Sequence, residues 1–69
     1  MAFSYDKLWK KLIDNKMKKK DLQNVIKTTP KTIARMGRNE YVSLQTLDRI
    51  CNYFKCDIGD IVEHVEGNE

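Results

Sequence analysis

Two cations four residues apart, Lys31 and Arg35, best combine residue type and spacing for a chemical task. An α-helix places residues four apart on one face, where an ammonium and a guanidinium can donate hydrogen bonds side by side. Thr29 and Thr32 add hydroxyls beside them, and Pro30 adds only apolar surface. This donor set suits hydrogen bonding to phosphates and to the acceptor edges of bases.

The remaining residue types predict that the protein is not an enzyme. His64 is its single histidine, and the sequence holds no Gly-rich phosphate loop and no nucleophile elbow. Cys51 and Cys56 are too few for a disulfide scaffold and lack the spacing of a zinc motif, so we expect no metal and no other cofactor. We expect Cys51 to be a small buried hydrophobe.

The segment around the two cations has the pattern of a short helix over 30–38. Thr29 can accept hydrogen bonds from the free amides of a helix start, and Pro30 suits the first helical position. At about 100° per residue, Ala34 shares the face of the cations. The opposite face carries the residues expected to pack inward, which are Ile33, Met36 and Gly37.

Apolar residues at helical spacing predict five helices, no strand and therefore an all-α bundle. The segments are 4–15, 18–26, 30–38, 43–54 and 57–65. We expect Ser4, Ser43 and Asp57 to cap helix starts, and Asn15 to end the first helix. The residues expected to face the core, beside those of the third segment, are Tyr5, Leu8, Trp9, Leu12, Ile13, Leu22, Val25, Ile26, Leu44, Leu47, Ile50, Cys51, Phe54, Ile58, Ile61, Val62 and Val65.

The charge divides unevenly along the chain. Residues 1–40 carry eleven Lys/Arg against four Asp/Glu, a net +7, and residues 41–69 carry two against six, a net −4. This asymmetry favours a polyanionic partner for the basic half, although a solvated lysine-rich surface would show the same charge. Lys18, Lys19 and Lys20 crowd the start of the second helix, where the helix dipole disfavours cations unless a phosphate binds there.

Length and hydropathy predict one domain over 1–69. No apolar run approaches membrane-spanning length, and the first residues lack a signal-peptide pattern. We therefore expect a cytoplasmic protein with no membrane partner.

Residues 17–65 resemble the helix-turn-helix of the Cro/CI-like (Xre) family of bacterial and phage regulators. The motif covers about 18–37, and residues 42–47 and 56–61 resemble the small single-domain branch of the family. The resemblance implies a lambda-repressor-like five-helix bundle, with helices 2 and 3 forming the motif and helix 3, about 30–37, in the major groove. The base-reading positions that it implies are Thr29, Pro30, Lys31, Thr32 and Arg35.

Residues that flank the third helix are candidates for contacts to the DNA backbone. They are Lys18, Lys19, Lys20, Arg38, Asn39 and Tyr41. Two positions depart from the family pattern. Gln23 stands where many members have Ala, and Lys27 stands where most have Gly, at a turn that usually needs positive φ. A lysine in that conformation costs about 1 kcal/mol.

The sequence therefore predicts a transcriptional regulator that binds double-stranded DNA sequence-specifically. The alternative is a protein-interaction module, either antitoxin-like or polymerase-contacting, that uses the acidic residues 41–69 for a protein partner. The two functions are compatible, because the basic half could hold DNA while the acidic half faces protein. A homodimer that forms in solution or only on DNA is compatible with both, and its expected contacts are the loop around Tyr41 and the fourth or fifth helix.

Overall fold

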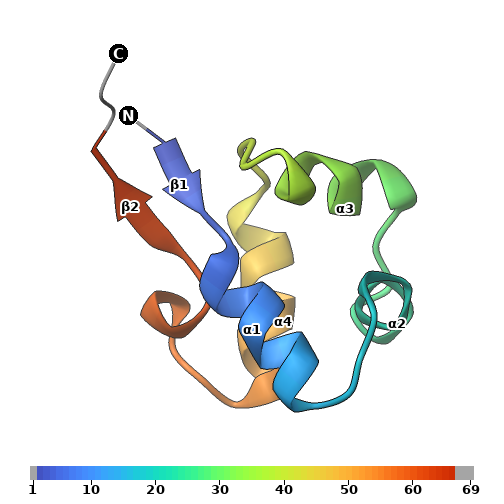
Figure 1. The fold of residues 1–69 in the computed structure, drawn as a ribbon. Helices are drawn as coiled ribbons and strands as arrows, with labels where there is room; N and C mark the ends of the chain where they lie inside the picture. The colour runs from blue at the N-terminus through green and yellow to red at the C-terminus, as the bar shows by residue number, and fades with distance from the viewer. Residues whose placement is uncertain (1, 67–69) are drawn as a thin grey trace.

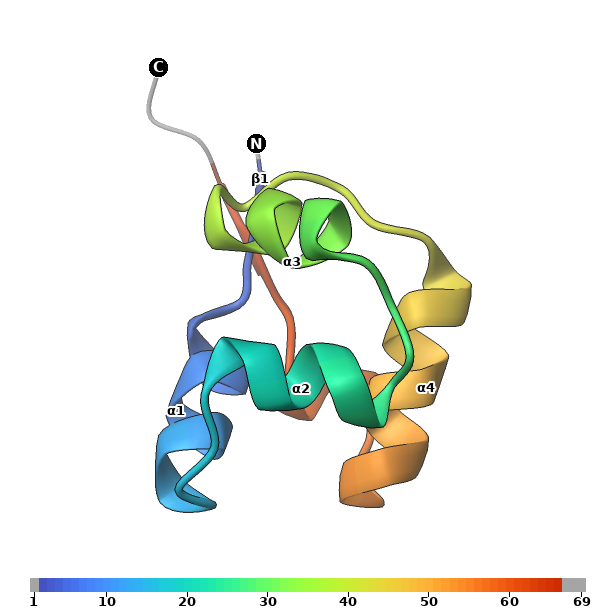
Figure 2. The same ribbon diagram turned by 90° about the vertical axis from the view of Figure 1, so that its right-hand side faces the viewer.

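The computed structural model describes residues 2–66, and this part of the chain holds four α-helices, a 3-10 turn and a two-stranded sheet (Figure 1). In chain order the elements are β1 (Ala2–Ser4), α1 (Asp6–Asp14), α2 (Lys19–Val25), α3 (Pro30–Gly37), α4 (Leu44–Phe54), η1 (Ile58–Asp60) and β2 (Glu63–Val65). In Figure 2, α2 lies in front of α1 and α4 and extends from one toward the other, and α3 lies above α2.

The prediction of a fifth helix over 57–65 is wrong, and so is the prediction of no strand. Asp57 and Asp60 do start a helical turn, since the Asp60 carboxylate accepts from the Asp57 amide at 3.0 Å, but this turn ends after three residues. Residues 63–65 then pair antiparallel with residues 2–4. The β-branched residues at the end of the chain favour extended backbone, and their partner strand lies about sixty residues earlier. The fold is therefore mostly helical, with four helices instead of five.

The predicted N-caps are confirmed for the third and fourth helices. The Thr29 hydroxyl accepts from the Thr32 amide at 3.3 Å, and the Ser43 hydroxyl accepts from the Thr46 amide at 3.2 Å. Ser4 accepts from the Asp6 amide at 3.2 Å, although Tyr5 takes the N-cap position itself.

The end of the first helix differs from the prediction by one residue. The left-handed residue is Lys16, with φ of 56°, and Asn15 keeps a negative φ at the C-cap. The Asn15 side-chain amide instead donates to the Lys11 carbonyl at 2.8 Å. Asn15 therefore ends α1 through a side-chain hydrogen bond to a carbonyl of the last turn, and the left-handed conformation falls on Lys16.

A single apolar core joins all four helices to Ile61, the residue that follows η1. Its buried apolar members, each on a predicted stripe, are Tyr5, Leu8, Leu12, Leu22, Ile26, Ile33, Met36, Leu47, Ile50 and Ile61. Expected core members that lie exposed instead are Ile13, Val25, Gly37, Leu44, Ile58 and Val65. These residues lie at the margins or ends of the stripes, where the neighbouring elements do not reach. Cys51, expected to be buried, is half-buried beside α4's end.

Tyr5 fastens the start of α1 to the loop after α3. Its ring is buried, and its hydroxyl donates to the Glu40 carbonyl at 2.8 Å. The Tyr5 amide donates to the Asn39 side-chain oxygen at 3.4 Å. Burial raises the pKa of the Tyr5 phenol above its usual value.

We expect Tyr5→Phe to lower the free energy of unfolding by about 1 kcal/mol at neutral pH, because the Glu40 carbonyl loses its donor. The folded-state pKa of Tyr5 lies above its unfolded value of about 10, so this stabilisation is complete below that pH and is lost as the pH rises past it. Urea denaturation of both proteins at pH 7 and above pH 10 checks this expectation. A difference in stability that stays constant across this range contradicts it.

Candidate nucleic-acid interface

Helix α3 has a buried face and an exposed face. Ile33 and Met36 are buried in the core, whereas Lys31, Ala34 and Arg35 are exposed on the other side. The helix begins with the Thr29 cap and with Pro30 at its first position, so its backbone direction is set from the first turn. The two cations therefore extend from a helix whose opposite face is fixed.

The other base-reading candidates cluster at the start of the same helix. Pro30 is exposed and offers no donor. The Thr29 hydroxyl caps α3 by accepting from the Thr32 amide, and the Thr32 hydroxyl oxygen lies 3.1 Å from it. Lys31 and Arg35 are consequently the principal charged donors among the five candidates.

The three lysines at the start of α2 are exposed, and one of them, Lys19, lies where α1, α2 and α3 meet. The Lys18 amide donates to the Asp21 carboxylate at 2.9 Å, which satisfies one orphan donor of the helix start. The Lys19 ammonium lies 4.5 Å from the centre of the Trp9 ring, in cation–π geometry. It also lies 3.5 Å from the point that a Cβ at Gly37 would occupy. Lys19 thus joins the start of α2 to the end of α3, and Gly37 borders it instead of packing inward.

The candidates after α3 all have structural partners of their own. Arg38 pairs with Glu40, with its Nε 2.9 Å from a carboxylate oxygen. This hydrogen bond raises the pKa of Arg38 and lowers the pKa of Glu40. The nearby charge of Arg35 also lowers the pKa of Glu40. Asn39 has φ of 58° and accepts from the Tyr5 amide.

Tyr41, the last backbone candidate, is 68% exposed. Its ring packs edge-on against Phe3, with ring centres 5.8 Å apart. Tyr41 therefore joins the loop after α3 to β1, and most of its surface remains accessible to a partner.

The turn between α2 and α3 has the positive φ that the resemblance implies. Lys27 stands there with φ of 54°. This turn also contacts α4, because Arg49 lies within 3.5 Å of the carbonyls of Ile26 and Lys27, and sequence analysis did not predict this contact. It likewise missed that Trp9 holds Lys19, whereas the close spacing of Arg38 and Glu40 could have indicated their pairing.

The arrangement is that of a helix-turn-helix, with α2 and α3 joined by a short turn and α3 exposed along one face. Residues 7–67 match the model of the Cro/C1-type helix-turn-helix DNA-binding domain, and the chain belongs to this family. The resemblance to the Cro/CI-like family is confirmed. Within residues 2–66, no helix is long and apolar enough to cross a membrane.

A solved structure that this chain resembles is that of the transcriptional regulator VanUg. The two sequences are 47% identical, and the match covers 96% of this chain and 88% of that chain, with a TM-score of 0.91. A search of curated proteins finds no match.

Proposed function

We propose that this DNA-binding regulator of transcription recognises specific double-stranded sequences by placing α3 in the major groove. The observation that carries the proposal is the division of α3, with Ile33 and Met36 buried and with Lys31 and Arg35 exposed. Arg35 can pair with guanine O6 and N7 through two hydrogen bonds, and Lys31 can reach the same acceptors. Thr29 and Thr32 can bond phosphates or bases and offer methyl groups to thymine, and Pro30 offers only apolar contact.

The backbone contacts in this proposal come from both ends of the motif. Lys18, Lys19 and Lys20 stand at the start of α2, where free amides and ammonium groups together attract phosphate. Among them, Lys19 is positioned by Trp9. The candidates after α3 are Arg38, Asn39 and Tyr41. We expect Arg38 to contribute less to the affinity for DNA than a lysine at the start of α2, because Glu40 offsets its charge.

Selection of bound duplexes from a random-sequence pool tests the proposal. We expect the pool to converge on a short motif that contains guanine, because Arg35 and Lys31 are the charged donors of α3. Retention of duplexes without any enriched motif would show binding by charge alone and would contradict sequence-specific reading.

The surface beside the end of α3 further supports binding as a homodimer. An apolar cleft of about 150 Å³ opens there, lined in part by Phe3, Tyr41, Leu44 and Ile58. Leu44 is 75% exposed. We expect a second copy to bind at this cleft and the two α3 helices of the dimer to read half-sites about one helical turn apart.

We expect Leu44→Glu to weaken binding to a duplex with two half-sites while leaving binding to a single half-site unchanged, because a charge in the cleft opposes burial against a second copy. Sedimentation of the protein with each duplex measures the stoichiometry directly. Equal two-to-one complexes for the wild type and Leu44→Glu would contradict this contact.

A further inference from the structure

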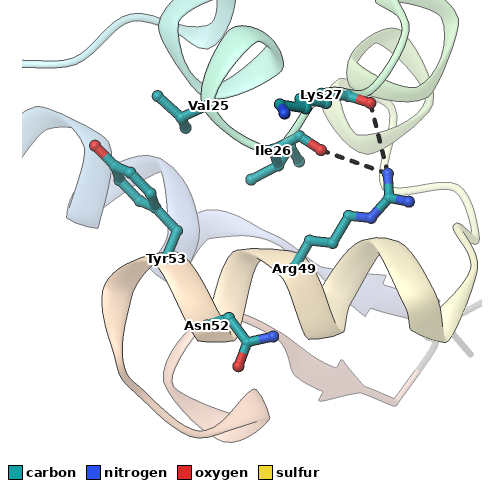
Figure 3. A pocket seen from close by; sticks show the side chains of 6 residues that line it. All are labelled: Val25, Ile26, Lys27, Arg49, Asn52 and Tyr53. Atoms are coloured by element: carbon teal, nitrogen blue, oxygen red, sulfur yellow. Dashed lines mark hydrogen bonds between the residues drawn. The ribbon is translucent and has the colours of Figure 1, made fainter.

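Arg49 reaches from α4 across an open hollow to the turn of the helix-turn-helix (Figure 3). The hollow measures about 540 Å³ and lies between the end of α2 and α4, with Val25, Asn52 and Tyr53 among its lining residues. One terminal nitrogen of the guanidinium donates to the carbonyls of Ile26 and Lys27, each at 3.5 Å. The side chain therefore connects α4 to a turn 22 and 23 residues earlier in the chain.

Ile26 is the C-cap residue of α2 and Lys27 follows it, so neither carbonyl accepts a hydrogen bond within the helix. The amides around them are already used, because Lys27 donates to the Asn24 carbonyl at 3.4 Å and Thr28 donates to the Gln23 carbonyl at 3.1 Å. A cation at the last carbonyls of a helix is favourable, and a guanidinium can donate to more than one acceptor.

The same turn contains the unfavourable backbone of Lys27. Its φ of 54° is a left-handed conformation that a lysine adopts at a cost. Two residues later Thr29 caps α3, so the conformation at Lys27 decides the direction in which α3 leaves α2. Arg49 restrains this conformation because it donates to the carbonyls of Ile26 and Lys27.

We propose that Arg49 is a positioning residue for DNA reading, which holds the Ile26 and Lys27 carbonyls and thereby fixes α3 relative to α4. This inference rests on the proposed function of α3. Arg49 acts through the turn, and the exposed cations of α3 make the contacts to bases. Its effect on DNA binding is therefore coupled to the residue at position 27 and does not require a contact between Arg49 and a phosphate.

A double-mutant cycle of Arg49→Met and Lys27→Gly tests the proposal on the selected duplex. Methionine keeps an extended stem and removes the donors, and glycine adopts the left-handed conformation without strain. Lys55→Gly is the matched control, because Lys55 has the same φ of 54° at the end of α4. We expect Arg49→Met to weaken binding by about tenfold in the wild-type background and also in the Lys55→Gly background. In the Lys27→Gly background we expect the same substitution to weaken binding by about threefold or less.

Two further readouts separate positioning from charge. The dependence of binding on salt should keep its slope in Arg49→Met, since a lost phosphate contact would reduce the slope by about 0.9. Hydrogen exchange of the Thr28 amide should accelerate, because the turn opens more often. Arg49→Lys keeps the charge, but the lysine side chain is shorter and does not reach both carbonyls as the guanidinium does, so we expect it to weaken binding almost as much as Arg49→Met.

Equal losses in the Lys27→Gly and Lys55→Gly backgrounds, or a reduced salt slope, would overturn the inference. So would unchanged binding in Arg49→Met. Arg35→Ala, measured on the same duplex, keeps the two proposals apart. If Arg35→Ala binds the duplex as tightly as the wild type does, the reading function of α3 is overturned. If Arg35→Ala binds more weakly but Arg49→Met binds as tightly as the wild type, only the role of Arg49 is overturned.

Discussion

Arg35→Ala is expected to weaken binding to the selected duplex by about 1–3 kcal/mol, which is about 5- to 150-fold. Arg35 is exposed on α3, and the buried residues Ile33 and Met36 hold the opposite face of the helix. Removal of its guanidinium should take away the proposed bidentate base contact without disturbing the core. Competition binding with the selected duplex and with a duplex of unrelated sequence measures both the affinity and the preference between them.

The contrast with Lys19 makes this expectation specific. Lys19→Ala should weaken binding to both duplexes by the same factor and lower the salt slope by about one, as loss of a phosphate contact does. Arg35→Ala should instead bring the two affinities closer together. Equal preference between the duplexes for the wild type and Arg35→Ala would mean that Arg35 does not read bases.

The second large effect concerns the buried face of the same helix. Met36 is fully buried, and Met36→Ala should lower the free energy of unfolding by about 2–5 kcal/mol. A domain of this length has a total stability of roughly 3–10 kcal/mol, so the variant should be partly unfolded near room temperature or melt far earlier. Urea denaturation followed by circular dichroism provides the measurement.

Ile13→Ala is the matched control for Met36→Ala. Ile13 was expected in the core from its spacing, yet its side chain is 73% exposed. Its removal should change stability by less than about 0.5 kcal/mol. A loss for Met36→Ala as small as that for Ile13→Ala would contradict the packing of α3 on the core.

Helix spacing predicted the buried face of each helix, because the side chains of one turn lie at fixed angles to one another. It could not decide how wide each face is, and so Ile13 and Leu44 were assigned to a core that does not reach them. Caps were predicted well, since Thr29 and Ser43 bond to amides only three residues away. The fifth helix was predicted wrongly because strand pairing joins residues 2–4 to residues 63–65, and the periodicity of one segment carries no information on such a partner.

The charged residues show the same division between local and distant contacts. Exposure of Lys31 and Arg35 followed from their angular position on α3. Contacts of Lys19 with Trp9 and of Arg49 with the turn depend on how helices pack, and no spacing in the sequence indicates them.

Part of the acidity of residues 41–69, which suggested a protein partner, also has a local role. Asp57 accepts from the Ile58 amide at 2.7 Å, and Asp60 accepts from the Asp57 amide at 3.0 Å. Both carboxylates therefore serve the start of η1, whose free amides favour negative charge. The charge asymmetry between the two halves of the chain is accordingly in part a consequence of helix capping.

Repeating the random-sequence selection with Arg35→Ala tests the reading role of α3 most directly. The wild-type motif should contain a guanine position that Arg35→Ala no longer prefers, while the preferences at the other positions remain. An Arg35→Ala motif identical to that of the wild type at every position would contradict base reading by this face of α3.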